Sequence, residues 1–352
     1  MNKKNNFSSE NPFRRGEQGA HEEVGLNAPD RNASPRFDEV STDLRRKIKK
    51  ILIVFNPDAG KGHAKTHALQ LLNELEIQTP DSSILMFESH SLTAMQEFWA
   101  TKPEADVAVI VGGDGTLGKN IDAMIKNDVD IPIFAFGKGT ANDFATYLGT
   151  QTNAKEAAKT ILNGETAEID TLLVNGTDYA INVACGGAFT NGVNTYKKRV
   201  KQIWGKAAYL ARAIFHSFNL KPQRVKFEII DKDDNELVIE EDIFMFYIAN
   251  SDTVGTIKNA APLANISDGL LDLAIIKKCG LFERLAVKTA QSKCKIHENK
   301  NVIYLQGKSF TVSVDTQKPI AKDFAYTDLD GNRYTEYPFH IEVGKKIRFI
   351  IK

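Results

Sequence analysis

The sequence is poor in cysteine and has no excess charge. Its 352 residues include three cysteines, none in a CxxC pair, and 45 basic residues balance 45 acidic ones. Sparse cysteines without a secretory signal predict a reducing compartment and no disulfide framework, and they speak against a structural zinc site. A net charge of zero gives no global field that would attract nucleic acid, so no nucleic-acid partner is expected.

Long hydrophobic runs are also missing. No apolar run approaches the roughly 18–20 residues of a membrane span. The N-terminus has mixed charges and lacks the apolar core of a signal peptide. Residues 1–46 are too polar to bury a core and are predicted to be a disordered tail. A cytoplasmic protein is therefore expected.

Apolar runs of strand length alternate with helical spacing over residues 47–167. The runs lie at 51–55, 84–87, 107–111 and 131–137. Strands that alternate with helices predict an α/β domain with a parallel sheet and right-handed crossovers.

The pattern changes after about residue 168. Strand-rich segments with polar turns follow, and DKDDNE at 231–236 is typical of a hairpin turn. Residues 168–336 are therefore predicted to form a second, mainly antiparallel domain. The pattern alone leaves open whether the last strand-like stretches, HIEVG and KIRFIIK, close this domain or return to the first.

Three glycine-bearing turns follow strands of the first domain: NPDAGKG at 56–62, GGDGT at 112–116 and GKGTAND at 137–143. Ligands of an open parallel sheet bind beyond the carboxyl ends of its strands. Glycine lets backbone amides approach a ligand, and amides at a helix N-terminus bind phosphate. The turns therefore predict a phosphate cradle, although none is a Walker A loop or a GxGxxG fingerprint.

In this order and spacing, NPDAGKG, GGDGT and GTANDFA resemble the catalytic domain of the diacylglycerol kinase family, above all its soluble bacterial lipid kinases. INVACGG, YIANS, APLANISDGLLDLAII and YTDLDGN resemble the second domain of that family. The resemblance covers roughly residues 48–352. It implies an ATP- and Mg²⁺-dependent lipid kinase that phosphorylates a lipid hydroxyl, most simply that of diacylglycerol, to give phosphatidic acid. It also implies a β-sandwich second domain and final strands (337–352) that return to the nucleotide-binding domain.

The resemblance assigns roles to particular residues. Asp330 matches the aspartate of the family's DGE, beside its presumed catalytic base, and Asp330, Asp114 and Lys61 are the catalytic candidates. A metal site in the second domain would use Asn265, Asp268 and the Leu270 carbonyl. The nucleotide-binding residues would be Asn56, Pro57, Asp58, Ala59, Gly60, Lys61, Gly112, Gly113, Asp114, Gly115, Thr116, Thr140 and Asn142.

Four positions depart from the family pattern. Gly118 and Lys119 replace the Asn-Glu that usually follows GGDGT-x, Gly137 replaces a proline, and Asn332 replaces the glutamate of DGE. An amide cannot act as a general base, so Asp330 is the remaining acidic candidate. Lys119 either faces phosphate oxygens or points to solvent. Two alternatives therefore stay open: a soluble-substrate kinase similar to NAD kinase, and a degenerate kinase that binds nucleotide or lipid without turnover.

A basic stretch marks the second domain. No acidic residue lies between Asp178 and Glu228, and the centre of this interval has helical spacing with a broad apolar face. A basic amphipathic helix with a tryptophan is typical of a membrane surface, although a core-facing helix with a solvated basic side would share the pattern. Peripheral contact with the inner face of the membrane is therefore expected, and a homodimer is possible. The expected contact residues are Lys197, Lys198, Arg199, Lys201 and Trp204.

Overall fold

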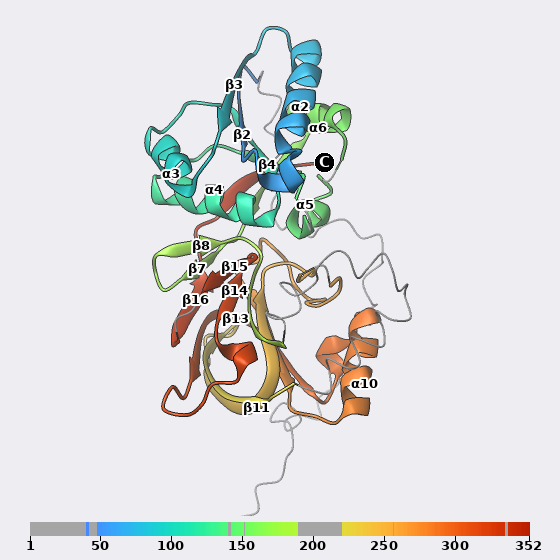
Figure 1. Ribbon diagram of the computed structural model, residues 1–352. Coiled ribbons are helices and arrows are strands. Elements are labelled where there is room, and N and C mark those ends of the chain that lie inside the picture. The colour runs from blue at the N-terminus through green and yellow to red at the C-terminus, as the bar shows by residue number, and fades with distance from the viewer. Residues whose placement is uncertain are drawn as a thin grey trace, which may run out of the picture.

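The computed structural model describes residues 40–41, 48–139, 142–150, 152–188, 220–255, 257–334 and 337–352. Most of the predicted tail, residues 1–46, lies outside them. Its described part differs from the prediction, since Val40–Ser41 forms the short strand β1, which pairs with residues 166–167. Two domains are stacked end to end (Figure 1).

The first domain is built on sheet A, a seven-stranded sheet. Five neighbouring strands pair in parallel, as the alternating pattern predicted, and β6 and β1 extend one edge through antiparallel pairing. In spatial order the strands are β1 (Val40–Ser41), β6 (Glu165–Ile169), β17 (Ile347–Ile351), β5 (Ile133–Gly137), β4 (Val107–Gly112), β2 (Lys50–Phe55) and β3 (Ser83–Glu88).

Helices cover both faces of sheet A. On one face, α2 (Ala64–Gln78) and α6 (Ala154–Asn163) pack against the sheet through aliphatic side chains. On the other face lie α3 (Leu92–Ala100), α4 (Asp114–Lys126) and α5 (Asp143–Tyr147). The short helix α1 (Ala59–Gly62) follows β2. Two buried layers thus hold the sheet, which fixes the positions of the turns at its carboxyl edge.

The second domain is built on sheet B, an antiparallel ten-stranded sheet that folds over on itself. The long strands β11 and β13 each pair with β10 and with β12, which closes a ring of four strands. The strands are β7 (Leu172–Val174), β8 (Asp178–Ala180), β9 (Val183–Gly187), β10 (Gln223–Asp231), β11 (Glu236–Ala249), β12 (Leu271–Lys277), β13 (Val302–Val314), β14 (Thr327–Leu329), β15 (Asn332–Tyr334) and β16 (Phe339–Val343). The expected β-sandwich second domain is confirmed.

The chain returns to the first domain at its end. Strand β17 inserts between β5 and β6, which confirms the expected return. The return begins later than residue 337, because β16 pairs with β13 and β7 inside sheet B. The buried core of sheet B lies between its two layers, and α10 (Leu281–Ser292) packs outside them.

Helix α4 forms the junction between the domains (Figure 1). Its Lys126 Nζ lies 2.8 Å from Asp178 Oδ1, and its Asp122 Oδ1 accepts a hydrogen bond of 2.9 Å from the Tyr179 amide. The helix that follows GGDGT therefore contacts the second domain directly. Among the described residues, no helix is long and apolar enough to span a bilayer.

Candidate active site

The three glycine-bearing turns meet at one edge of sheet A. Strands β2, β4 and β5 are parallel neighbours, with Phe55 paired to Val111 and Gly112 to Gly137. Since each turn follows the last residue of its strand, all three leave the sheet at the same carboxyl edge. The structure therefore brings together the segments that the sequence singled out.

The second and third turns touch through glycine backbone. A Cβ added to Gly139 would lie 2.3 Å from the Gly113 Cα, a distance that no side chain tolerates. Asn142 fixes this approach, because its Oδ1 accepts a 2.5 Å hydrogen bond from the Gly139 amide. Contact between the turns thus requires glycine at position 139 and crowds any side chain at Gly113, whose added Cβ would lie 3.0 Å from the Gly139 Cα.

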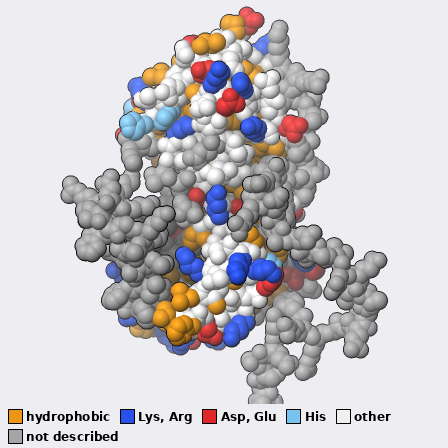
Figure 2. Space-filling view, turned by 90° about the vertical axis from the view of Figure 1, so that its right-hand side faces the viewer, with side chains coloured by type: hydrophobic (Ala, Val, Ile, Leu, Met, Phe, Trp, Pro, Cys, Tyr) orange, Lys and Arg blue, Asp and Glu red, His pale blue; other side chains and the backbone are white. Residues whose placement is uncertain are grey.

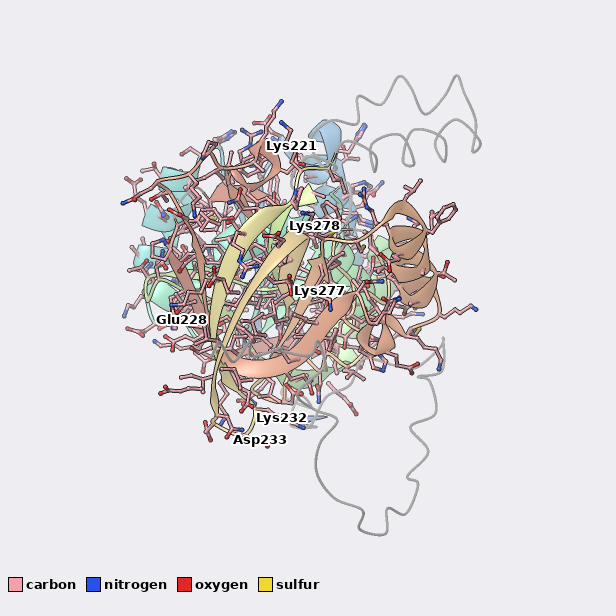
Figure 3. The ribbon with its side chains drawn as sticks, turned by 90° about the horizontal axis from the view of Figure 1, so that it is seen from below. Lys221, Glu228, Lys232, Asp233, Lys277 and Lys278 are labelled. Atoms are coloured by element: carbon pink, nitrogen blue, oxygen red, sulfur yellow. The ribbon has the colours of Figure 1, made fainter. Side chains whose placement is uncertain are left out.

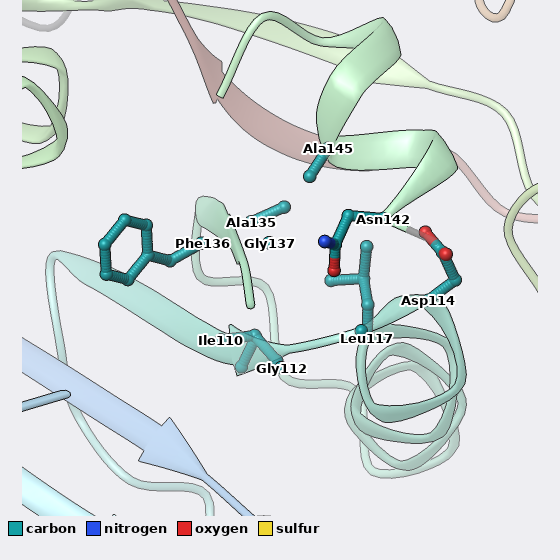
Figure 4. A pocket seen from close by; sticks show the side chains of 10 residues that line it. Ile110, Gly112, Asp114, Leu117, Ala135, Phe136, Gly137, Asn142 and Ala145 are labelled. Carbon is teal, nitrogen blue, oxygen red and sulfur yellow. The ribbon is translucent and has the colours of Figure 1, made fainter. Parts of the chain in front are cut away.

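A small cavity of about 10 Å³ lies beneath this contact (Figure 4). Gly112, Asp114, Leu117, Gly137 and Asn142 are among the residues that line it. A cavity of this size holds about one water molecule. A nucleotide would therefore lie over the turns, against the backbone, and not inside this cavity.

Asp114 joins the two turns at the start of α4. Its Oδ2 accepts a hydrogen bond from the Asp143 amide and its Oδ1 one from the Phe144 amide, both at 3.1 Å. The carboxylate thus caps the N-terminus of α5, a role that the sequence did not indicate. Each oxygen keeps a lone pair, so the predicted contact with phosphates or magnesium stays a prediction.

The N-terminus of α4 has the properties of an anion site. Gly113 precedes the helix, and its carbonyl accepts hydrogen bonds from Thr116 (2.9 Å) and Leu117 (3.0 Å). The amides before them, at Asp114 and Gly115, have no acceptor within the helix, as at any helix N-terminus. Unpaired amides and the helix dipole favour a phosphate at this point.

The first turn is ordered by Asn56. Its Oδ1 accepts a 2.9 Å hydrogen bond from the Asp58 amide, and its carbonyl accepts one of 3.0 Å from Ala59. Gly62 ends α1 with a φ of +82°, which favours glycine. Thr140 lies outside the described residues, as does the side chain of Lys61. Their predicted roles therefore stay predictions.

Asp330 is buried where the two domains meet. Its Oδ2 accepts a 2.6 Å hydrogen bond from the Ile181 amide, and its Oδ1 accepts bonds from Asn182 (3.1 Å) and Val183 (2.9 Å). Its backbone has a φ of +48°, in the left-handed region. The carboxylate thus ties the turn between β14 and β15 to the start of β9.

Burial controls the charge of this carboxyl. It raises the pKa of Asp330 to about 7, with the negative charge of Asp114 acting in the same direction, while the amides of Ile181, Val183 and Asn182 oppose the shift. An aspartate that exchanges its proton near neutrality suits general-base catalysis. The base role that the sequence predicted is therefore chemically consistent with the geometry.

Gly118 lies directly beside Asp330. A Cβ added at Gly118 would lie 3.2 Å from the Asp330 Oδ2, and one added at Gly115 would lie 3.6 Å from the Asp330 carbonyl oxygen. The departure from the family pattern at Gly118 therefore leaves one side of the acidic group without a side-chain neighbour. Lys119, the second departure, is exposed on α4. Asn332 Nδ2 donates to the Leu329 carbonyl at 3.3 Å.

The predicted metal loop, residues 265–270, is held by hydrogen bonds to its own side chains and to Asp170. Asn265 Oδ1 accepts hydrogen bonds of 3.2 Å from the amide and hydroxyl of Ser267, and Asp268 Oδ1 accepts one of 3.0 Å from the Leu270 amide. Asp170 Oδ2 accepts a 2.7 Å bond from the Gly269 amide. The oxygen donors suit Mg²⁺ in kind. Among the described residues, however, no group of three His, Cys, Asp or Glu side chains could hold a metal.

A lysine supplies positive charge to the same loop. Lys346 Nζ donates to the Ser267 carbonyl at 2.9 Å and lies 3.9 Å from Asp170 Oδ1. The sequence gave no signal for Lys346 or Asp170, because they lie far from the loop along the chain. A magnesium ion in this loop therefore stays a prediction.

The fold and the edge of sheet A define a class: a two-domain protein with a parallel-sheet α/β domain, a β-sandwich domain and glycine-rich turns where the two meet. Comparisons with known proteins identify the family within this class. A family model described as "Diacylglycerol kinase catalytic domain" matches residues 50–174. One described as "YegS C-terminal NAD kinase beta sandwich-like domain" matches residues 183–348.

Curated relatives agree along most of the chain. The diacylglycerol kinase of Bacillus subtilis (strain 168) is 27% identical over 302 residues, which cover 84% of this chain and 96% of the relative. That of Staphylococcus carnosus (strain TM300) is 24% identical over 295 residues, 84% of this chain and 94% of the relative. The chain belongs to the diacylglycerol kinase family. As a member of a kinase family it is a phosphotransferase, and that membership implies the use of ATP.

Solved structures support the fold. A crystal structure of a diacylglycerol kinase from Bacillus anthracis str. Sterne has a TM-score of 0.62 at 20% identity, and it covers 87% of this chain and 98% of its own. Another solved structure from the same organism has a TM-score of 0.69 at 24% identity, and the match covers 87% of this chain and 96% of that one. The resemblance drawn from the three glycine turns is therefore confirmed at the level of family and fold.

Proposed function

We propose that this chain transfers the γ-phosphoryl group of ATP to the hydroxyl of diacylglycerol, giving phosphatidic acid. The observation that carries the proposal is the contact between Asp330 and the first turns of α4, seen at Gly115 and Gly118. It sets a carboxyl with a pKa of about 7 beside a phosphate-binding helix terminus. A phosphoryl donor and an alcohol acceptor would meet at this junction.

Each side of the junction has a proposed task. The amides that begin α4 hold the phosphates, and Asp330 accepts the proton that the lipid hydroxyl loses on attack. Phosphoryl transfer depends mainly on positioning and on neutralising charge. A magnesium ion, when bound, would neutralise phosphate charge, and Asp114 is the carboxylate on this chain best placed to hold it near α4.

The acceptor and its location belong to the same proposal. A diacylglycerol acceptor lies in a bilayer, so the protein would work in the cytoplasm at the inner face of the membrane. The expected contact residues at 197–204 lie outside the described residues. The basic and apolar character of that segment supports the proposal.

A degenerate kinase is the second candidate function. Asn332 favours it, and so do the amides of residues 181–183, which already occupy both oxygens of Asp330. Because these amides stabilise the charged form, they oppose the burial that raises the pKa of Asp330 and make it a weaker base than burial alone would. Restoring the usual acidic pair with Asn332→Glu would raise turnover if the missing glutamate limits an active enzyme.

One assay separates the candidates. The purified protein is given labelled ATP and Mg²⁺ with diacylglycerol, other lipids bearing free hydroxyls, or NAD. Labelled phosphatidic acid from diacylglycerol is the expected product. Labelled NADP would support the soluble-substrate alternative. No labelled product from either the native chain or Asn332→Glu would support the degenerate kinase and overturn the proposal.

A further inference from the structure

Helix α10 turns an apolar stripe toward solvent. Phe282 is 84% exposed and Leu285 is 43% exposed, and Ala286 and Thr289 are exposed as well. These four positions follow the i, i+3, i+4, i+7 spacing, so they share one face of the helix. A phenylalanine this exposed adds little to the packing of the part of the chain that the structure describes.

The opposite face of α10 already attaches the helix to sheet B. Val287 is buried in the cluster beneath the helix, and Arg284 stacks on the Phe244 ring at 4.2 Å. Glu283 Oε2 accepts a 2.9 Å hydrogen bond from the Gly280 amide at the start of the helix. The helix is thus fixed without Phe282 and Leu285, which leaves its outer stripe available for a partner.

The segment that carries the stripe is rich in positive charge. Residues 277–300 contain seven lysine or arginine residues and two glutamates, a net charge of +5 in a chain of net charge zero. Both glutamates are paired, Glu283 with Lys300 at 3.5 Å and Glu298 with Lys295 at 3.1 Å. Among the described side chains, Lys277, Lys288 and Lys293 have no acidic partner. The segment therefore carries a local excess of unneutralised positive charge.

The figures show this side of the molecule. Figure 2 faces the α10 side and shows a cluster of hydrophobic side chains low on the second domain, with lysine and arginine side chains nearby. Figure 3 looks from below, where Lys277 ends β12, Lys278 follows it, and α10 lies at the edge of the molecule. Apolar and basic groups thus share one outward-facing region.

We propose that α10 is an interfacial helix that seats the second domain on an anionic bilayer. Phe282 and Leu285 would enter the boundary between headgroups and acyl chains, while the surrounding lysines contact anionic headgroups. An outward apolar stripe with a basic surround is the pattern of such helices. A second copy of this chain is a poorer occupant, because the lysines without acidic partners on the two copies would repel each other. The inference rests on the proposed function, since a lipid acceptor gives the protein a reason to visit a bilayer.

The test measures docking without catalysis. The full chain is sedimented with vesicles of phosphatidylcholine, with or without phosphatidylglycerol, lacking diacylglycerol and ATP. We expect binding to the anionic vesicles, weakened about tenfold by Phe282→Ser from the lost apolar burial. Changing Lys277, Lys288 and Lys293 together to Gln should weaken it by roughly 10²-fold. Added salt should weaken the native chain likewise.

Matched controls separate docking from general surface effects. Ile77→Ser removes a side chain that is 68% exposed on α2, and Lys102, Lys155 and Lys232 changed to Gln remove equal charge elsewhere. Both control variants should bind like the native chain. Changing Lys197, Lys198, Arg199 and Lys201 to Gln removes the basic residues of the other expected membrane contact. The vesicle binding that remains in this variant then depends on α10.

Three outcomes would overturn the inference: no binding of the native chain to anionic vesicles, equal binding of Phe282→Ser, or self-association in solution that Phe282→Ser abolishes. The proposed function fails separately. It fails if the native chain docks but does not phosphorylate short-chain diacylglycerol dispersed in detergent. If the chain phosphorylates that substrate but does not sediment with vesicles, only the docking inference fails.

Discussion

The two sides of the domain junction present different chemical groups. On the first-domain side, glycines and helix termini present backbone amides, and Gly113 and Gly139 approach too closely for any side chain between them. On the second-domain side, a buried carboxyl, Asp330, is held by three amides. Backbone amides have fixed partial charges, whereas burial sets the charge of a carboxyl. The first side should therefore tolerate pH changes, and the second should respond to them.

Removing the carboxyl of Asp330 should have the largest effect on turnover. Asp330→Asn cannot accept a proton, and general-base contributions are typically about 10²–10⁴-fold. We expect a loss of that order in kcat with nearly unchanged ATP affinity, because the proposed nucleotide site lies on the first-domain side of the junction. Turnover on diacylglycerol and ATP binding by calorimetry measure the two effects.

The neighbouring Asp328 provides a matched control. It is also buried and accepts a 2.7 Å hydrogen bond from the Gly331 amide, but it lies outside the contact with α4. Asp328→Asn should cost stability more than turnover. In the native chain, the rate should rise with pH through about 7 as Asp330 loses its proton. A flat profile, or full activity in Asp330→Asn, would place the base elsewhere.

A second buried carboxyl should make stability depend on pH. Burial raises the pKa of Asp272 to about 7, although hydrogen bonds from Tyr304 and Gln306 oppose the shift. In an unfolded chain an aspartate has a pKa of about 3.9. At a pH between about 4 and about 7, the unfolded chain has therefore released a proton that the folded chain keeps. Stability should thus fall as pH rises from about 4 to about 7, by about 4 kcal/mol for this residue.

The variant Asp272→Asn isolates this contribution. An amide does not titrate, so the free energy of unfolding should lose that part of its pH dependence, while Asp330 keeps its own part. Urea unfolding at pH 5 and pH 8 measures the difference. An unchanged slope in Asp272→Asn would show that this carboxyl is ionised in the folded chain at both values.

The first-domain side can be tested through Asp114. Asp114→Asn removes a charge near the phosphate site and one of the two acceptors that cap α5. Losing one preorganised charge-stabilising group typically costs about 10²–10³-fold in rate. We expect such a loss, together with about 1 kcal/mol of stability from the weakened cap. A stability loss alone, with normal turnover in the folded fraction, would reduce Asp114 to a structural residue.

The sequence predicted the first-domain side better than the second. Strands β2 and β4 were predictable because apolar runs end at clear turn residues, and glycine marks positions where backbone must approach backbone. The hairpin between β10 and β11 was also predictable, and Ile230 pairs with Glu236 across it. These features depend on neighbours along the chain.

Features that depend on distant partners could not be predicted from the sequence pattern. The pattern left the place of strand β17 open, and only the family resemblance predicted its return to the first domain, where it pairs with β6. The Asp330 carboxylate binds amides about 150 residues away, so its burial and raised pKa have no local signal. Helix α10 also escaped, since its apolar residues face both inward and outward and blur the amphipathic pattern. Tertiary contacts, and not propensity, decide these features.

The smallest expected effect concerns the contact that joins the two sides. The variant Gly118→Asn restores the family's residue. A Cβ added at Gly118 lies 3.2 Å from the Asp330 Oδ2, so the side-chain amide of the new asparagine would lie near that oxygen. An amide that donates to this oxygen favours the carboxylate and should lower the pKa of Asp330 by about one unit. The pH–rate profile should therefore shift toward acid by that amount, with less than about a tenfold change in the plateau. Gly118→Ala adds the Cβ without the donor, so it should leave the midpoint in place. If both variants shift the profile equally, crowding and not hydrogen bonding sets the pKa, and the glycine at this position serves to make room for the acidic group.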